Sequence, residues 1–108
     1  MSSTTVTRGN SHETFYIQPS ITPAAVLTAI TATQTFAMPG LQTTDIIKVF
    51  GYNGAQTLGI LIGEADCFNA NVLSIQFANV TGGTLTPAAG VYTIQITRLE
   101  GPAPVTAV

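Results

Sequence analysis

Two segments of the chain alternate strictly between apolar and polar side chains, and this alternation most constrains the fold. Residues 73–77 alternate Leu, Ile and Phe with Ser and Gln, and residues 92–97 alternate Tyr, Ile and Ile with Thr and Gln. A period of two places successive side chains on opposite faces of a β-strand. Both segments are therefore expected to be strands with one buried and one polar face.

Shorter apolar runs recur between turn residues along the rest of the chain. They lie at 14–18, 34–38, 46–50 and 58–62, and the second of them ends at Pro39-Gly40. Frequent turn signals and little helical periodicity are typical of sandwiches and small barrels. The sequence therefore predicts an all-β fold, an antiparallel β-sandwich of jelly-roll-like or Ig-like type with six to eight short strands.

One segment, residues 20–32, fits either a strand or a helix. Thr22 followed by Pro23, with apolar residues at 26, 27 and 30, has the form of a helix start. The β-branched residues that follow at 30, 31 and 33 favour a strand instead. We expect a strand here, and the helix remains the alternative.

The length of 108 residues fits one domain with one core. Residues 1–12 are polar and rich in Ser and Thr, so we expect an N-terminal arm, either a frayed end or a segment that docks on a partner. Residues 13–100 form the expected β-sandwich domain. Residues 101–108 form a C-terminal tail, because the prolines at its start lack the donors that a sheet interior needs.

The surface of this chain is expected to carry few charges. Charged residues make up 7% of the sequence, against about 25% in an ordinary soluble domain. Low charge density and a net charge of -2 favour self-association, so we expect a homo-oligomer. The three cations, Arg8, Lys48 and Arg98, are scattered, which argues against a nucleic-acid partner. No apolar run approaches a membrane span, and no signal peptide is recognisable, which indicates synthesis in a cytoplasm.

The sequence offers no set of residues for nucleophilic or acid–base catalysis. His12 is the one histidine and lies in the expected arm, where nothing would hold it in place. Cys67 is the one cysteine and is expected to be a small buried residue beside Phe68. We therefore expect no enzyme, no catalytic residues and no bound cofactor.

Glu64 and Asp66 are the strongest candidates for paired carboxylates. Two residues apart on a strand, they would share a face at a spacing of about 7 Å. Such a pair is compatible with a glycosidase, or with a calcium site if Asn69 and Asn71 add oxygen ligands. Acids at the end of a strand are more often a solvated edge that discourages stray pairing. We expect this simpler role and no metal site.

Other polar and aromatic positions have structural or binding interpretations. Asp45 follows two threonines and is expected to bond turn backbone. Asn79-Val80-Thr81 matches a glycosylation sequon, which without a signal peptide is expected to be a chance match. A further possibility is a sugar platform on one sandwich face. Its four aromatic candidates are Tyr16, Phe50, Tyr52 and Tyr92.

A series of similarly spaced segments between residues 21 and 98 adds a family resemblance. They are Ala32-Thr33-Gln34-Thr35-Phe36, Pro39-Gly40-Leu41, Asp45, Leu58-Gly59-Ile60, Asn71-Val72-Leu73-Ser74-Ile75-Gln76-Phe77-Ala78-Asn79, Thr86-Pro87, and Tyr92-Thr93-Ile94 through Arg98. In these segments the chain resembles a small β-domain that recurs among structural proteins of tailed bacteriophages. Lys48 and the turn at Tyr52 depart from that pattern.

The resemblance implies a virion component, most simply a capsid decoration (cement) protein. Its implied partners are the major capsid protein and further copies of itself, with a homotrimer as the expected assembly, and its implied location is the capsid surface. A head- or tail-fibre adaptor is one alternative. A carbohydrate- or receptor-binding β-sandwich module is another, of a different functional class.

Overall fold

The structure is a computed structural model, and it describes residues 10–106. These residues contain strands and connecting segments but no helix. The strands are β1 (Ser11–Ile17), β2 (Ser20–Ile21), β3 (Thr31–Ala37), β4 (Ile46–Tyr52), β5 (Ile60–Asp66), β6 (Val72–Asn79) and β7 (Gly90–Leu99). The predicted all-β class is confirmed, and the strand number falls within the predicted range.

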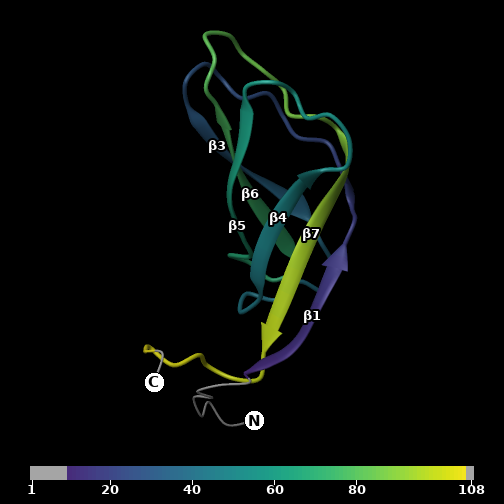
Figure 1. Cartoon of the computed structure of the whole chain (residues 1–108), viewed down its shortest axis with the longest axis vertical. Helices are drawn as coiled ribbons and strands as arrows, with labels where there is room; N and C mark the ends of the chain where they lie inside the picture. The colour runs from purple at the N-terminus through teal and green to yellow at the C-terminus, as the bar shows by residue number, and fades with distance from the viewer. Residues whose placement is uncertain (1–9, 107–108) are drawn as a thin grey trace.

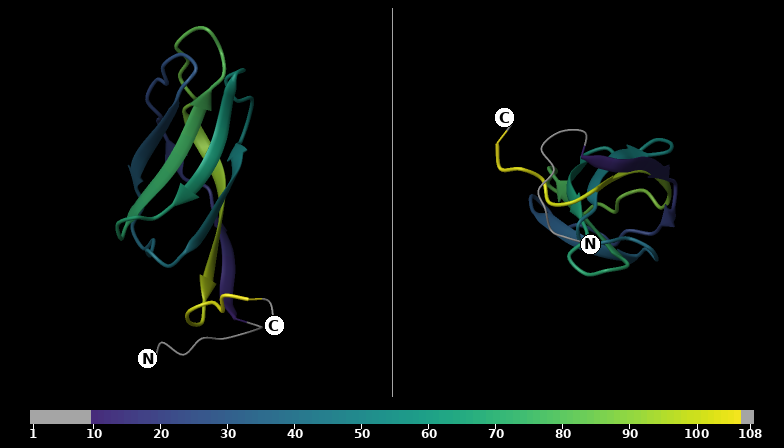
Figure 2. Two further views of the ribbon diagram at one scale, coloured as in Figure 1. Left: turned by 90° about the vertical axis from the view of Figure 1, so that its left-hand side faces the viewer. Right: turned by 90° about the horizontal axis from the view of Figure 1, so that it is seen from below.

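The seven strands of the described region belong to one antiparallel sheet with the order β1-β7-β4-β5-β6-β3, and β2 pairs with β7 beside this path (Figure 1). Between β4 and β5 the register in this region consists of Ile47 opposite Ala65 alone. The sheet therefore has two halves, β1-β7-β4 and β5-β6-β3, joined at a thin seam. Seen along the long axis, the strands surround a common interior, which is consistent with a small β-sandwich (Figure 2).

The core is built from the inward positions of the alternating segments. Leu73, Ile75 and Phe77 of β6 are fully buried, and Ile94 and Ile96 of β7 lie opposite them in the core. The polar residues between them alternate with the core residues, as the period of two requires. Those of β7 and Gln76 of β6 are half-buried, whereas Ser74 is 3% exposed and lines a depression with Glu64 and Asp66. The prediction of one buried and one polar face is confirmed for both strands.

The segment 20–32 contains no helix. Ser20 and Ile21 form β2, Val26 makes an isolated antiparallel bridge with Leu85, and β3 begins at Thr31. Val26 is fully buried, so this segment covers one end of the core. The helix alternative is therefore wrong, and the expected strand forms only at residues 20–21 and 31–32, with the bridge at Val26 and a turn at 28–29 between them. Burial of Val26 and Ile21 outweighs the weak local helix signal.

The ends of the described region refine the expected boundaries. Most of the expected arm, residues 1–9, lies outside the described residues. Ser11 and His12, which we assigned to the arm, belong to β1, with a bulge between Ser11 and Glu13 opposite β7. Asn10 continues this pairing, because its carbonyl accepts a hydrogen bond from Glu100 N at 2.7 Å. Pairing with the end of β7 and with Glu100 therefore places residues 10 and 11 beside the sheet, although their own sequence is polar.

The turn between β3 and β4 reverses the chain over Met38-Pro39-Gly40-Leu41. Leu41 N donates to Met38 O at 3.2 Å, and Gly40 has φ +93°. Proline followed by a residue with positive φ is the signature of a type II turn. Asn71 supports this turn from the β5–β6 connection, since its Oδ1 accepts from Gly40 N at 2.8 Å.

Candidate functional site

An exposed aromatic pair lies on the outer face of the half-sheet β1-β7-β4. Tyr16 of β1 and Phe50 of β4 are 58% and 54% exposed, and their ring centroids are 5.9 Å apart. They come from strands on either side of β7, and Gln95 of β7 stands between β1 and β4 in register with Tyr16 and Lys48. The sheet therefore fixes the spacing of the two rings.

Polar groups surround this pair. Gln95 Nε2 donates to Tyr16 Oη at 3.3 Å, and Lys48 Nζ lies 5.3 Å from the centroid of the Phe50 ring. A cation over an aromatic ring is attracted to the ring face. We call Tyr16, Lys48, Phe50 and Gln95 the aromatic face.

The aromatic face is suited to non-covalent binding. Exposed rings on a rigid sheet offer apolar area at low entropic cost, and aromatic residues are enriched where proteins contact one another. Gln95 and Lys48 add donors at its centre. The arrangement contains no paired acid and base, so the chemistry it supports is contact with an apolar or sugar surface.

Of the other two aromatic candidates for the sugar platform, Tyr92 lies in the interior and Tyr52 is half-buried against the core. Tyr52 and Tyr92 pack with ring centroids 5.3 Å apart, and Tyr92 is fully buried. Tyr92 Oη donates to Ala88 O at 2.6 Å and accepts from Gln56 Nε2 at 3.0 Å. Burial raises the pKa of the Tyr92 phenol, the Gln56 hydrogen bond opposes this, and nearby Tyr52 adds to the rise. The possible sugar platform on the outer face is therefore reduced to Tyr16 and Phe50.

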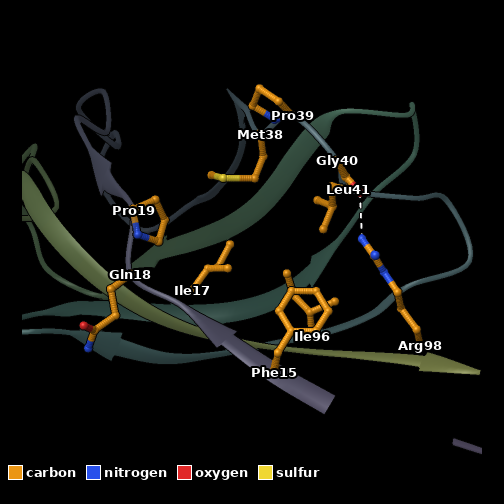
Figure 3. A pocket seen from close by; sticks show the side chains of 10 residues that line it. All are labelled: Phe15, Ile17, Gln18, Pro19, Met38, Pro39, Gly40, Leu41, Ile96 and Arg98. Atoms are coloured by element: carbon orange, nitrogen blue, oxygen red, sulfur yellow. Dashed lines mark hydrogen bonds between the residues drawn. The ribbon is translucent and has the colours of Figure 1, made fainter. Parts of the chain in front are cut away.

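A groove of about 480 Å³ separates β1 from the turn at 38–41 (Figure 3). Its side chains are mainly apolar, and they come from the edge strand, the turn and β7 together. The lining residues are Phe15, Ile17, Gln18, Pro19, Met38, Pro39, Gly40, Leu41, Ile96 and Arg98. The groove marks the place where the two halves of the sheet do not close on each other.

Arg98 lies at the rim of this groove and contacts residues on both of its sides. Its Nε donates to Asp45 Oδ1 at 3.0 Å, its Nη2 donates to Gly40 O at 2.7 Å, and its guanidinium lies 5.1 Å from the Phe15 ring centroid. Glu13 adds a longer ion pair at 3.8 Å. Asp45 also accepts from Gln42 N, which confirms its predicted turn role. The pairing with Arg98 was not foreseen, because no local pattern joins the two positions.

The two residues considered for nucleophilic chemistry lie apart. His12 is exposed at the bulge of β1. Cys67 is buried after β5, as predicted, and its Sγ donates to Asn69 O at 3.0 Å. The thiol thus has a structural partner and no histidine among its hydrogen-bond partners.

The acidic candidates share a small polar depression on the outer face of β5 and β6. Glu64 and Asp66 both line it, with a volume of about 150 Å³. Asn71, proposed as a further oxygen ligand, instead holds Gly40 N. Within residues 10–106 no three His, Cys, Asp or Glu side chains gather closely enough to hold a metal ion.

The side-chain amide of Asn79, the asparagine of the sequon, is buried and hydrogen-bonded. It is 1% exposed, and its Nδ2 donates to Val26 O at 3.0 Å and to Gly83 O at 2.7 Å. Its Oδ1 accepts from the backbone N and the hydroxyl of Thr81. An amide with all these partners is a structural clamp rather than a glycan acceptor in the folded chain.

Residues 10–106 contain no helical segment with the length and apolarity that a membrane crossing requires. Comparison with protein-family models, with curated proteins and with solved structures finds no match to this chain.

Proposed function

We propose that this chain is a structural subunit of a phage virion, a capsid decoration protein that binds the major capsid protein on the outer capsid surface and stabilises the head. The observation that carries this proposal is the aromatic face. A β-domain with 7% charged residues holds two exposed rings on its outer surface. A surface of this kind is stabilised when a neighbour covers it. The resemblance stated above supports the choice of a capsid as that neighbour.

The low charge content also predicts how such binding behaves. Contact through Tyr16 and Phe50 depends on apolar burial, which added salt does not screen. Lys48 is the one cation of the aromatic face and is already placed over Phe50. We therefore expect capsid binding to change little between about 0.05 M and about 0.5 M salt.

Co-sedimentation with capsids that lack the subunit tests the proposal. The double variant Tyr16→Thr/Phe50→Thr removes both exposed rings and keeps β-branched side chains on the strands. We expect it to bind at least about tenfold more weakly than the unaltered chain, a loss of about 1.4 kcal/mol. Phe68→Thr is the matched control, because Phe68 is 70% exposed but lines the depression beside Glu64. The proposal fails if the unaltered chain does not co-sediment and gives the capsids no added heat resistance.

A carbohydrate-binding role is the second candidate, and the same pair of rings favours it. Tyr16 and Phe50 are close enough to stack against one sugar ring, with the amide of Gln95 beside them. A glycan array separates the two candidates. Binding to a glycan that is lost in the double variant, together with no capsid binding, would replace the first proposal with the second.

A further inference from the structure

The free edge of β1 is an unprotected site for strand addition. Within residues 10–106, β1 pairs with β7 and with no other strand. Edge strands are commonly blunted by lysine, proline, bulges or covering segments. The bulge of β1 lies at its start, and residues 14–17 carry neither lysine nor proline. An edge in this state is a template for a further strand.

The register shows which backbone groups are free. Tyr92 N donates to Pro19 O, and Ile17 lies opposite Ile94 in the same register. Because bonded and non-bonded pairs alternate in an antiparallel ladder, Phe15 and Ile17 bond to β7. The backbone groups of Thr14 and Tyr16 consequently point away from β7, toward any strand that is added.

The opposite edge of the sheet, β3, has a chain segment beside it at one position. The side chain of Gln34 in β3 accepts from Ala24 N at 2.7 Å and donates to Ala24 O at 2.8 Å. This pair of bonds holds the segment that precedes β3 against that strand. The outer edge of β3 is thus contacted at Gln34, whereas within residues 10–106 no strand pairs with the outer edge of β1, which borders the apolar groove of about 480 Å³.

We propose that residues 1–9 of a second copy of this chain add to the free edge of β1 as a strand, with Val6 entering the groove between Phe15 and Met38. Four consecutive residues of this segment, 4–7, are β-branched, as strands favour. Nine extended residues reach about 30 Å, enough to follow a seven-residue strand of about 23 Å. Main-chain hydrogen bonds would supply affinity and the groove would select the side chain.

Charge also fits this occupant. Arg8 is the one charged side chain of residues 1–9. The groove rim holds two carboxylates, Glu13 and Asp45, around the single guanidinium of Arg98, so its net charge is negative. A cationic segment is attracted to this rim.

The position of Asn10 favours a second copy, rather than the same copy, as the source of the docking segment. Asn10 O accepts from Glu100 N, so Asn10 still lies beside the chain that follows β7, at the end of β1 away from Pro19. To pair with their own β1, residues 1–9 would need a tight reversal directly before Asn10, which pairing with a neighbouring copy does not require. If each copy donates its segment to the next, the copies form a closed ring when the rotation between neighbouring copies allows closure.

Complementation between two full-length variants tests this arrangement, with molar mass measured by light scattering. Val6→Asp disables the docking segment, and Thr14→Pro removes an edge N–H while the bonds to β7 remain. We expect an oligomer from the unaltered chain and the 11.2 kDa monomer from each variant alone. A mixture of the two should regain a complex of one copy of each, because one intact segment then meets one intact edge.

Two controls separate docking from damage to the fold. Thr5→Asp adds the same charge to the opposite side of an extended segment, and Thr14→Val removes the hydroxyl but keeps the N–H. Both should remain oligomeric, and all variants should unfold within a few degrees of the unaltered chain. A monomeric unaltered chain, an oligomeric Val6→Asp variant, or a mixture that stays monomeric would each overturn the inference. No capsid is needed, so this outcome is independent of the capsid experiment.

Discussion

Arg98 and Asp45, 53 positions apart in the chain, form a hydrogen-bonded ion pair in which Arg98 Nε donates to Asp45 Oδ1 at 3.0 Å. The Asp45 side chain is 1% exposed, and that of Arg98 is 24% exposed. The pair joins the end of β7 to the turn before β4. It also fixes the rim of the groove, because Arg98 Nη2 holds Gly40 O.

Replacing Asp45 should therefore destabilise the fold. Asp45→Ala leaves the Arg98 guanidinium without its buried partner and Gln42 N without its acceptor, and we expect a loss of about 2–4 kcal/mol. Urea unfolding followed by circular dichroism measures the change. Asp66→Ala is the matched control and should cost less than about 1 kcal/mol, because Asp66 Oδ1 has no hydrogen-bond partner within the described residues. Equal losses in the two variants would contradict this role of Asp45.

Stability should fall in alkaline solution because of Tyr92. Its pKa is raised above the ordinary value of 10.0, chiefly by burial, so the folded chain holds this proton more tightly than the unfolded chain. The contribution is complete below pH 10.0 and is lost as pH rises through the folded-state pKa. Urea unfolding between pH 8 and about pH 11.5 tests this trend, with phenolate absorbance as a second readout. Tyr92→Phe should flatten the trend, and an unchanged slope would count against it.

Gly59 should tolerate no side chain. Its φ is +96°, and a Cβ there would overlap Cγ2 of Thr81. We expect Gly59→Ala to lower the free energy of unfolding by roughly 2–4 kcal/mol. Gly82→Ala is the control in the neighbouring loop, where a Cβ would meet nothing within 4 Å. Thermal unfolding should separate the two variants clearly, and the interpretation fails if their midpoints agree.

Asn79 should be important for stability through its side-chain amide. Asn79→Ala leaves Thr81 N without its acceptor and removes one of two donors from Val26 O and from Gly83 O, which keep Leu85 N and the Thr81 hydroxyl. We expect a loss of about 1–3 kcal/mol. Asn69→Ala removes the same side chain from an exposed position and should be nearly neutral. Chemical unfolding of both variants provides the comparison. A neutral Asn79→Ala would show that water replaces these bonds.

The strand content could be predicted because alternation is a local property. In residues 73–77 and 92–97 each apolar side chain is two positions from the next, and a strand is the conformation that buries them together. The buried thiol of Cys67 and the turn role of Asp45 were accessible for the same reason. Each depends on the residues immediately around it.

The long-range side-chain hydrogen bonds that hold the strands together could not be predicted from the sequence. Gln34 bonds to Ala24, Asn79 to Val26, and Asp45 to Arg98, and in each pair the amide or carboxylate could equally have faced water. Which polar group is buried depends on the long-range approach of strands. The groove is likewise a product of tertiary structure, because it exists only where β1 and the turn at 38–41 face each other.

The direction in which Phe50 and Tyr52 point depends on both the local sequence and the tertiary structure. The sequence by itself predicts a strand over residues 46–50 and places Tyr52 in the turn that follows. The structure instead continues β4 to Tyr52, and on a regular strand a spacing of two would place both rings on the same face. The register with β7 shifts between Val49 and Gly51, so Phe50 is the extra residue of a bulge, and Gly51 has φ +137°. Phe50 therefore points outward beside Tyr16, while Tyr52 turns inward against Tyr92. Pairing with β7 imposes that bulge, and with it the tertiary structure decided which of the rings predicted to form a platform reach the surface.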